Sequence, residues 1–366
     1  MPDEIGAIEP QHKKNKWLIG VAVLVIVILA GGWYARSFAA PYFIEKAKTA
    51  LNNKDAATAT KNLNIALALD SQNPVAYAYL GHIALGLDRA NPGSDTPFPN
   101  ADFAKAIDNY EKALSLGLAN AKNRGVYKQT LEFAGYSYWS QKEYGRAVAK
   151  YLEQIREFPG GSFWARNLVA EDYFARSNKP QEALDILIPA PNSSDVSERF
   201  LGNAYTLLTR LSLYFGNPAD TKRYAALALE NSADKNSLSA ALAYLSLAIQ
   251  FAKERDLPKA LAEYRKAEAI DEGNTRCTLA SIYVFGGDTT KAIQVGKEKL
   301  AAAGSPINYP NSICIEALAR SYIAKKNPAE AKKYLEQYMD VTGTFKDKNI
   351  YVMRNQAEFE TLLPSF

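Results

Sequence analysis

The residues that most often carry enzyme chemistry are scarce in this chain. It has 366 residues with only two histidines, His12 and His82, and two cysteines, Cys277 and Cys314. No His–Cys cluster, glycine-rich phosphate loop or G-x-S-x-G elbow occurs. Acidic pairs are abundant, but on amphipathic helices such pairs usually form the solvated face. The sequence therefore predicts a non-enzymatic protein with no metal or cofactor, whose function is binding.

The charge distribution argues against nucleic acid as the partner. The formal net charge is +4, and the basic residues are interspersed with acidic ones rather than gathered into a stripe. Such a pattern is a weak basis for phosphate contacts. The 22 tyrosines are expected mostly in the core, with their hydroxyls near water.

The elements that must position any binding residue come from a recurring pattern. Ala-x3-Tyr-x2-Ala occurs at residues 106–113 and again at 260–267, with looser copies elsewhere. A repeat of this kind predicts an all-α array of about eight pairs of antiparallel helices, elongated and without a single central core. The central position of the pattern in the second helix of each pair is occupied by Leu63, Tyr110, Tyr151, Leu187, Ala225, Tyr264, Gly296 and Leu335.

Other positions predict where the helices pack and begin. In the first helices, Leu or an aromatic residue is followed three positions later by small residues and then by another aromatic residue, as in Leu131, Ala134, Gly135 and Tyr138. The small residues let two helices approach closely. Pro or Asp marks the expected starts of second helices at 179–180, 217–218, 257–258, 287–288 and 327–328.

Together these features resemble the tetratricopeptide repeat (TPR) family. The best copies are "YLGHIALGL" with "AKAIDNYEKALSLG", "FAGYSYWSQKEYGRAVAKYLEQIREFP", "YLSLAIQFAKERDLPKALAEYRKAEAID" and "ALARSYIAKKNPAEAKKYLEQYM". The resemblance covers residues 41–341. It implies a right-handed superhelical α-solenoid that binds a protein or peptide partner.

In that family the first helices line the concave face. Carried over by position, the resemblance implies a lining of His82, Glu132, Tyr136, Trp139, Asp172, Arg176, Lys253, Glu316 and Arg320. This set mixes charges of both signs and does not resemble a basic clamp for peptide C-termini. Tyr136 and Trp139 are the expected apolar anchors, because aromatic residues dominate protein contacts; packing between helices is the alternative for Trp139.

Three segments depart from the repeat. Residues 87–100 contain three prolines and are expected to form an edge loop, either a contact loop or a tolerated insertion. Residues 189–200 separate two halves of about four units and are expected to bend the array. Residues 342–366 are amphipathic and are expected to cap the exposed apolar face of the last unit.

The cysteines fall on the first helices of two successive units. They are too few for a disulfide framework and lack paired metal-ligand spacing. A bridge between neighbouring helices is geometrically conceivable, but two buried free thiols are the expected state, because free cysteine is commonly buried.

Residues 17–34 form an uncharged run that is expected to cross a membrane. The run, WLIGVAVLVIVILAGGWY, has aromatic residues at both ends and follows Lys13, Lys14 and Lys16. A cleaved signal peptide is the alternative, but the small-residue site at 38–40 precedes Pro41. We expect residues 1–16 to be a cytoplasmic tail and the array to lie on the periplasmic or outer side.

The expected function is that of a single-pass membrane-anchored scaffold for a protein or peptide partner. The alternatives are a fixed structural subunit of a membrane complex and an accessory factor of an envelope enzyme such as a cell-wall synthase or glycosyltransferase. The sequence leaves the oligomeric state open.

Overall fold

The structure is a computed structural model. It describes residue 19 and the ranges 21–24, 38–87, 100–120, 123–196, 198–232, 234, 236–303, 309–345 and 350–366. The chain divides into two compact units, residues 1–150 and 151–366.

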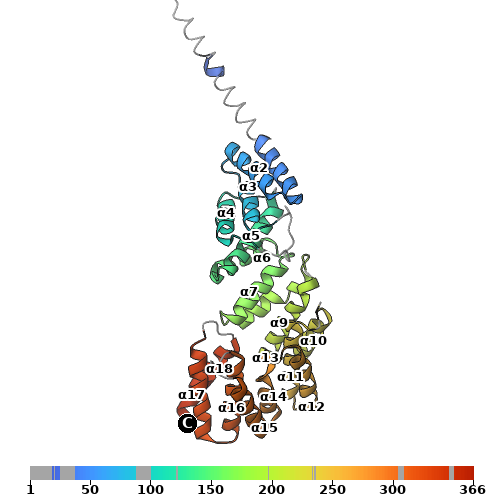
Figure 1. Ribbon diagram of the computed structural model, residues 1–366, viewed down its shortest axis with the longest axis vertical. Helices are drawn as coiled ribbons and strands as arrows, with labels where there is room; N and C mark the ends of the chain where they lie inside the picture. Colours follow the sequence, from blue (N-terminus) through green and yellow to red (C-terminus); the bar gives the residue numbers. More distant parts are fainter. Residues whose placement is uncertain are drawn as a thin grey trace, which may run out of the picture. The chain divides into compact units, whose positions relative to one another are not determined.

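The first unit consists of helix pairs (Figure 1). Residues 38–52 are helical and precede α2 (Ala56–Leu69). The next pairs are α3 (Pro74–Ala84) with α4 (Phe103–Ser115), and α5 (Arg124–Ser140) with α6 (Tyr144–Glu157), which crosses the division between the units.

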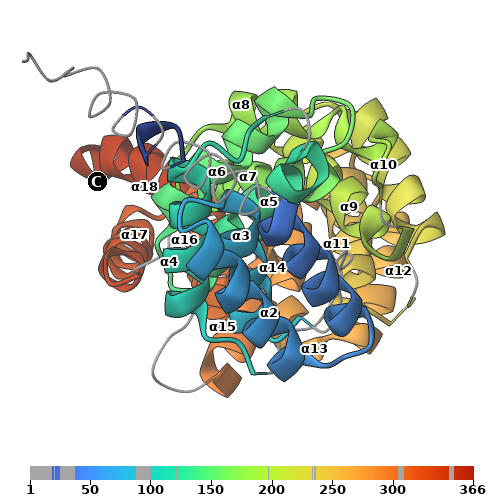
Figure 2. The ribbon, with the colours of Figure 1, turned by 90° about the horizontal axis from the view of Figure 1, so that it is seen from above.

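The second unit continues the same plan with five more pairs. These are α7 (Phe163–Ala175) with α8 (Pro180–Leu187), α9 (Glu198–Phe215) with α10 (Pro218–Glu230), α11 (Leu238–Lys253) with α12 (Leu257–Ile270), α14 (Thr278–Gly286) with α15 (Thr289–Ala303), and α16 (Tyr309–Ala324) with α17 (Pro328–Gly343). The short elements are η2 (Ala190–Asn192), α13 (Glu272–Thr275) and η3 (Leu363–Ser365), and α18 (Ile350–Leu362) follows the last pair. Both views place α10 and α12 outside α9 and α11 (Figures 1 and 2). The prediction of an all-α array of helix pairs is confirmed.

The repeating pattern marks the contact between the two helices of a pair. Its central side chains at Leu63, Tyr110, Tyr151, Leu187, Ala225, Tyr264 and Leu335 are all buried. A glycine makes room for one of them, because a Cβ at Gly81 would collide with the ring of Tyr110. Small and large residues thus interlock across the pair, as ridge-and-groove packing requires.

Each turn within a pair contains one residue in the left-handed backbone region. Gly86, Gly216 and Gly287 supply three of them, and Lys54, Lys142, Asn178, Arg255 and Lys326 supply the others. At the last turn, Lys326 N–H donates to Ile323 O and Asn327 N–H donates to Tyr322 O, both at 3.0 Å. This is the Schellman arrangement that ends a helix. The side chain of Asn327 then accepts from Glu330 N–H and begins α17.

Lys326→Gly is expected to stabilise the protein by about 0.5–1 kcal/mol. Lys326 has φ 54°, a conformation that is unfavourable for a residue with a Cβ, and glycine removes this cost at the expense of some unfolded-state entropy. Denaturant unfolding measures the difference. The matched control is Lys332→Gly in the interior of α17, which is expected to lower stability by roughly 0.5–1 kcal/mol. Equal effects of the two substitutions would contradict the role of this turn.

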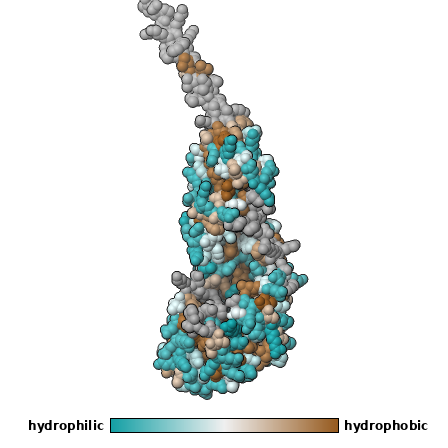
Figure 3. Space-filling model, viewed as in Figure 1, coloured by the Kyte–Doolittle hydropathy of each residue, from teal (hydrophilic) through white to brown (hydrophobic). Residues whose placement is uncertain are grey.

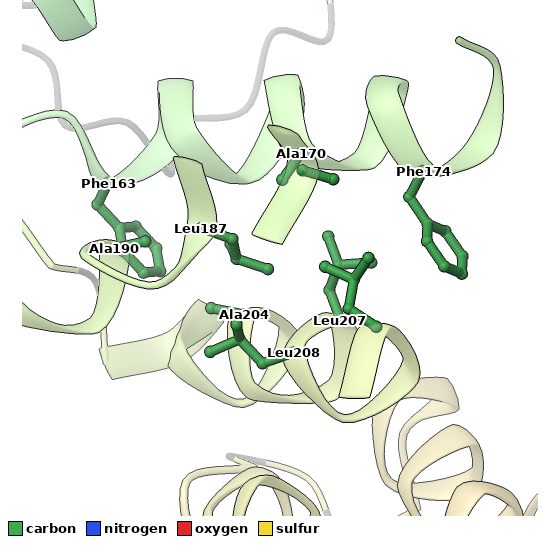
Figure 4. Packing of buried hydrophobic residues seen from close by; sticks show 10 residues of the cluster. Phe163, Ala170, Phe174, Leu187, Ala190, Ala204, Leu207 and Leu208 are labelled. Atoms are coloured by element: carbon green, nitrogen blue, oxygen red, sulfur yellow. The ribbon is translucent and has the colours of Figure 1, made fainter. Parts of the chain in front are cut away.

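The segment near 189–200 is a packed link within the second unit. Ala190 is buried in one cluster with Phe163 and Phe174 of α7, Leu187 of α8 and Leu208 of α9 (Figure 4). The chain divides at Lys150 and Tyr151 instead. The sequence break therefore does not coincide with the boundary between compact units.

The two cysteines form a disulfide bond, which corrects the expectation of free thiols. Cys277 is the N-cap residue of α14, and Cys314 lies on α16, the first helix of the following pair. Their Cα atoms are 4.8 Å apart, within the range that a disulfide spans. Close packing of successive first helices brings the thiols together.

Most of the predicted membrane segment lies outside the described residues. Within 17–34 the structure describes Ile19 and residues 21–24, which are helical and exposed. No helix in the described ranges is both long enough and apolar enough to span a bilayer. The tail 1–16 and the interior of the edge loop, 88–99, also lie outside the described residues.

Candidate functional site

His82 belongs to the core of the first unit rather than to a binding surface. Its side chain is fully buried, and its ring centroid lies 5.4–5.7 Å from those of Tyr79, Tyr110 and Phe133. His82 Nδ1 is 2.8 Å from Ala78 O and 3.2 Å from Tyr110 Oη. Burial lowers the pKa of His82 to about 4, so the ring is neutral at pH 7. The structure thus corrects the expected position of this residue.

The other predicted positions in the first unit lie on α5. Tyr136 is 36% exposed and its ring centroid lies 6.1 Å from that of Phe103. Trp139 is half-buried, with its ring edge-to-face against Tyr144 at 5.1 Å, and Glu132 is also half-buried. Tyr136 is therefore the more accessible of the two expected anchors.

Asp172 and Arg176 form a local structure at the end of α7. The buried Asp172 carboxylate accepts from Ser177 Oγ at 2.8 Å and lies 4.0 Å from an Arg176 guanidinium nitrogen. These contacts lie within six residues of sequence. They stabilise the end of the helix, as capping interactions do.

The second unit contains an apolar cavity of about 350 Å³. Its walls come from four first helices, α9, α11, α14 and α16, and from α18. The apolar lining comprises Leu213, Leu238, Leu242, Leu245, Ile249, Phe285 and Ile313. Of the predicted site residues, Lys253 and Glu316 line this cavity, and Arg320 lies one turn from Glu316 on α16.

Three cations line the same cavity and lie over aromatic rings. The Arg210 guanidinium is 4.6 Å from the ring centroid of Phe174, and Lys253 Nζ is 5.5 Å from that of Phe285. Arg354 lies 5.0 Å from the ring of Tyr214 and 5.6 Å from that of Tyr351. Desolvation, together with the nearby charge of Arg354, lowers the pKa of Lys253. Cation–π contacts hold these groups without neutralising their charge.

The one acidic residue of the lining is already paired. Glu316 accepts from Arg320 Nε at 2.9 Å, and the two terminal nitrogens of Arg320 each donate to Glu358 of α18 at 2.8 Å. Arg320 also donates to Asn355 at 3.1 Å. This planar, multidentate arrangement suits a guanidinium and holds α18 against α16.

The last helix makes contacts at both of its ends. Near its C-terminal end, Phe359 is buried against Tyr338 of α17, with ring centroids 5.0 Å apart. Near its start, Tyr351 Oη donates to Arg210 O of α9 at 2.8 Å, and its ring meets those of Phe174 and Tyr214. The helix after the last pair therefore completes a wall of the cavity.

Glu358→Gln is expected to weaken the docking of α18 at pH 7 by roughly 0.5–1 kcal/mol, because the ion pair is partly exposed. Hydrogen bonds from Arg320 lower the pKa of Glu358 from its ordinary 4.5. A lowered folded-state pKa gives a contribution that is complete above pH 4.5 and is lost as the pH falls through the folded-state value. Hydrogen-exchange protection of α18 should thus differ between the two proteins at pH 7, and the difference should decrease as the pH falls below 4.5. A difference that does not decrease with falling pH would contradict this assignment.

Sequence reasoning missed Arg210, Tyr351 and Arg354. Arg210 lies on a first helix, so its position on the helix could have indicated it. Tyr351 and Arg354 come from the helix after the last pair, for which the repeat supplies no register. Their place at the cavity depends on a contact between residues 141 positions apart.

Comparisons with known proteins give structural likeness alone. No protein-family model and no curated protein matches the chain. Among solved structures it is similar to YrrB, a TPR protein with an unusual peptide-binding site, with TM-score 0.44, 16% identity and coverage of 58% of this chain and 93% of that one. It is also similar to a tetratricopeptide repeat protein from Parabacteroides merdae, with TM-score 0.37, 15% identity and coverage of 89% and 98%. A third is the C-terminal part of a TPR repeat-containing protein from Cytophaga hutchinsonii, with TM-score 0.42, 13% identity and coverage of 85% and 98%.

Proposed function

We propose that the chain is a non-enzymatic TPR-like scaffold that binds a protein or peptide partner through the first-helix surface of its second unit. The observation that carries this proposal is the cavity, in which apolar side chains and three cations from several helices face one space. Apolar pockets with a few converging polar groups are typical binding sites. The face of the molecule seen in Figure 3 is mostly hydrophilic, with apolar residues scattered over it.

We further propose that residues 17–34 anchor the chain in a membrane and that the array lies on the periplasmic or outer side. The uncharged run with flanking lysines supports the anchor. The disulfide between Cys277 and Cys314 supports the location, because disulfides persist in oxidising compartments.

A reporter that is active on only one side of the membrane, fused after Phe366, tests the location. Activity on the outer side is expected, and activity in the cytoplasm would contradict it. Thiol labelling under denaturing conditions adds a second readout, since the buried Cys277 and Cys314 should be labelled in denatured protein only after a reductant has been added.

Purification of the full chain in mild detergent, followed by identification of bound proteins, tests the scaffold itself. A specific set of companions that is lost when Ile249 in the cavity is replaced by Asp is expected. A single stoichiometric companion whose binding does not depend on Ile249 would instead indicate a fixed structural subunit. An envelope enzyme among the companions would indicate an accessory role.

A further inference from the structure

We propose that the cavity of the second unit receives a protein segment in which a large apolar side chain stands next to a carboxylate, and that α18 is part of this receptor site. The proposal rests on the proposed function and specifies the chemistry of the partner. Size, charge and the role of α18 each support it.

The size and lining of the cavity suit an apolar side chain with its adjoining backbone. A volume of about 350 Å³ is near the lower end of the roughly 300–1,000 Å³ found for ligand pockets. Leu242, Leu245 and Ile249 of α11 belong to the lining, together with Phe285 of α14 and Ile313 of α16. Leu238 also belongs to the lining and is 55% exposed. The apolar surface thus continues outward from the cavity, which favours an extended segment over a small enclosed molecule.

The charge of the cavity requires an acidic partner. Arg210, Lys253 and Arg354 line it. In the part of the chain that the structure describes none of the three forms an ion pair within 4.0 Å, although Arg354 is close enough to Glu358 to help lower the pKa of that carboxyl. Glu316 is committed to Arg320. The charges of Arg210 and Lys253, and part of the charge of Arg354, are therefore left for a ligand to neutralise. A carboxylate next to the apolar side chain would do so with charge-assisted hydrogen bonds.

The C-terminal helix makes the site specific to this chain. Arg354, Tyr351 and Asn355 are contributed by α18, which two independent contacts hold in place. One is the hydrogen bond from Tyr351 to Arg210 O, and the other is the pairing of Arg320 with Glu358. A regular helix pair would not supply these side chains at this position, so the site exists only where α18 is docked.

A peptide-display selection tests the proposal. A library of random 12-residue peptides is selected on the full chain in lipid nanodiscs, on Lys253→Glu, and on the control Lys332→Glu. Lys253 and Lys332 are both exposed, and both substitutions change the net charge equally, but Lys332 on α17 does not line the cavity. Thermal unfolding of the three proteins confirms that each is folded.

The expected result is enrichment of Leu, Ile or Phe adjacent to Asp or Glu, with roughly tenfold weaker enrichment on Lys253→Glu and none of this loss on Lys332→Glu. Peptides that lack acidic residues, or that bind all three proteins equally, would overturn the proposal and leave the proposed function in place. No enrichment over empty nanodiscs would overturn both. Displacement of all selected peptides by micromolar laurate, together with tighter binding of laurate than of any peptide, would assign the cavity to a fatty acid and also overturn the proposal.

Discussion

Tyr110→Ala is expected to lower the free energy of unfolding of the first unit by about 3–5 kcal/mol, the range measured for removing large buried aromatic rings. The Tyr110 ring is fully buried between α3 and α4 and fills the space that Gly81 leaves open. Alanine would leave a cavity against a rigid helix pair and remove the hydroxyl that lies 3.2 Å from His82 Nδ1. Denaturant unfolding followed by circular dichroism measures the change.

Two control variants distinguish the effect of losing the Tyr110 ring from the effect of losing its hydroxyl group and from the effect of removing a tyrosine elsewhere. Tyr110→Phe keeps the ring and is expected to cost about 1 kcal/mol through the lost hydrogen bond. Tyr136→Ala, at a partly exposed position, should change stability by much less than Tyr110→Ala. A loss below about 1 kcal/mol for Tyr110→Ala would contradict the assignment of the repeating pattern to the core of each helix pair.

Breaking the disulfide is expected to lower stability by about 2–4 kcal/mol. Cys277 and Cys314 are separated by 37 positions, so the bridge restricts a long loop in the unfolded chain. It also joins α14 to α16, two of the helices that line the cavity. The Cys277→Ser, Cys314→Ser double variant, compared with the parent protein by denaturant unfolding, gives the size of the effect.

The control for this experiment is the reductant itself. Dithiothreitol should shift the unfolding midpoint of the parent protein toward that of the double variant and leave the double variant unchanged. The disulfide would be contradicted if the parent protein had the same unfolding midpoint with and without reductant and contained two free thiols after purification without reductant.

The helix pairs could be predicted because their determinants are local and repeated. The spacing of Ala106, Tyr110 and Ala113 puts three residues on one helical face, and the structure buries all three. The starts of second helices could also be predicted from the sequence, since Asn217 and Asn327 cap α10 and α17 directly before proline. The left-handed residues Lys142 and Lys326 in the turns could not be predicted, because the hydrogen bonds that end a helix can force any residue into the left-handed region.

The candidate site was less predictable because it depends on contacts that are distant in the sequence. His82 was assigned to a surface by its helical position, but three aromatic neighbours, Tyr79 of α3, Tyr110 of α4 and Phe133 of α5, enclose it in the core. Lys253 and Glu316 were expected on first helices as parts of a binding surface; both line the cavity, and their role in binding stays a prediction. The disulfide depends on the packing of two successive first helices, and the contact of α18 with α9 joins residues 141 positions apart. No local pattern in the sequence indicates either contact.

We propose that a protein partner binds in the cavity of the second unit. The most direct test places the photocrosslinking residue p-benzoylphenylalanine at Ile249, inside the cavity, or at Lys332, outside it, in the full chain in native membranes. Illumination followed by mass spectrometry of the adducts identifies what lies within reach of each position. We predict a discrete protein adduct from position 249 that is absent from position 332 and is reduced by Lys253→Glu. No adduct from position 249, or the same adducts from both positions, would contradict the account.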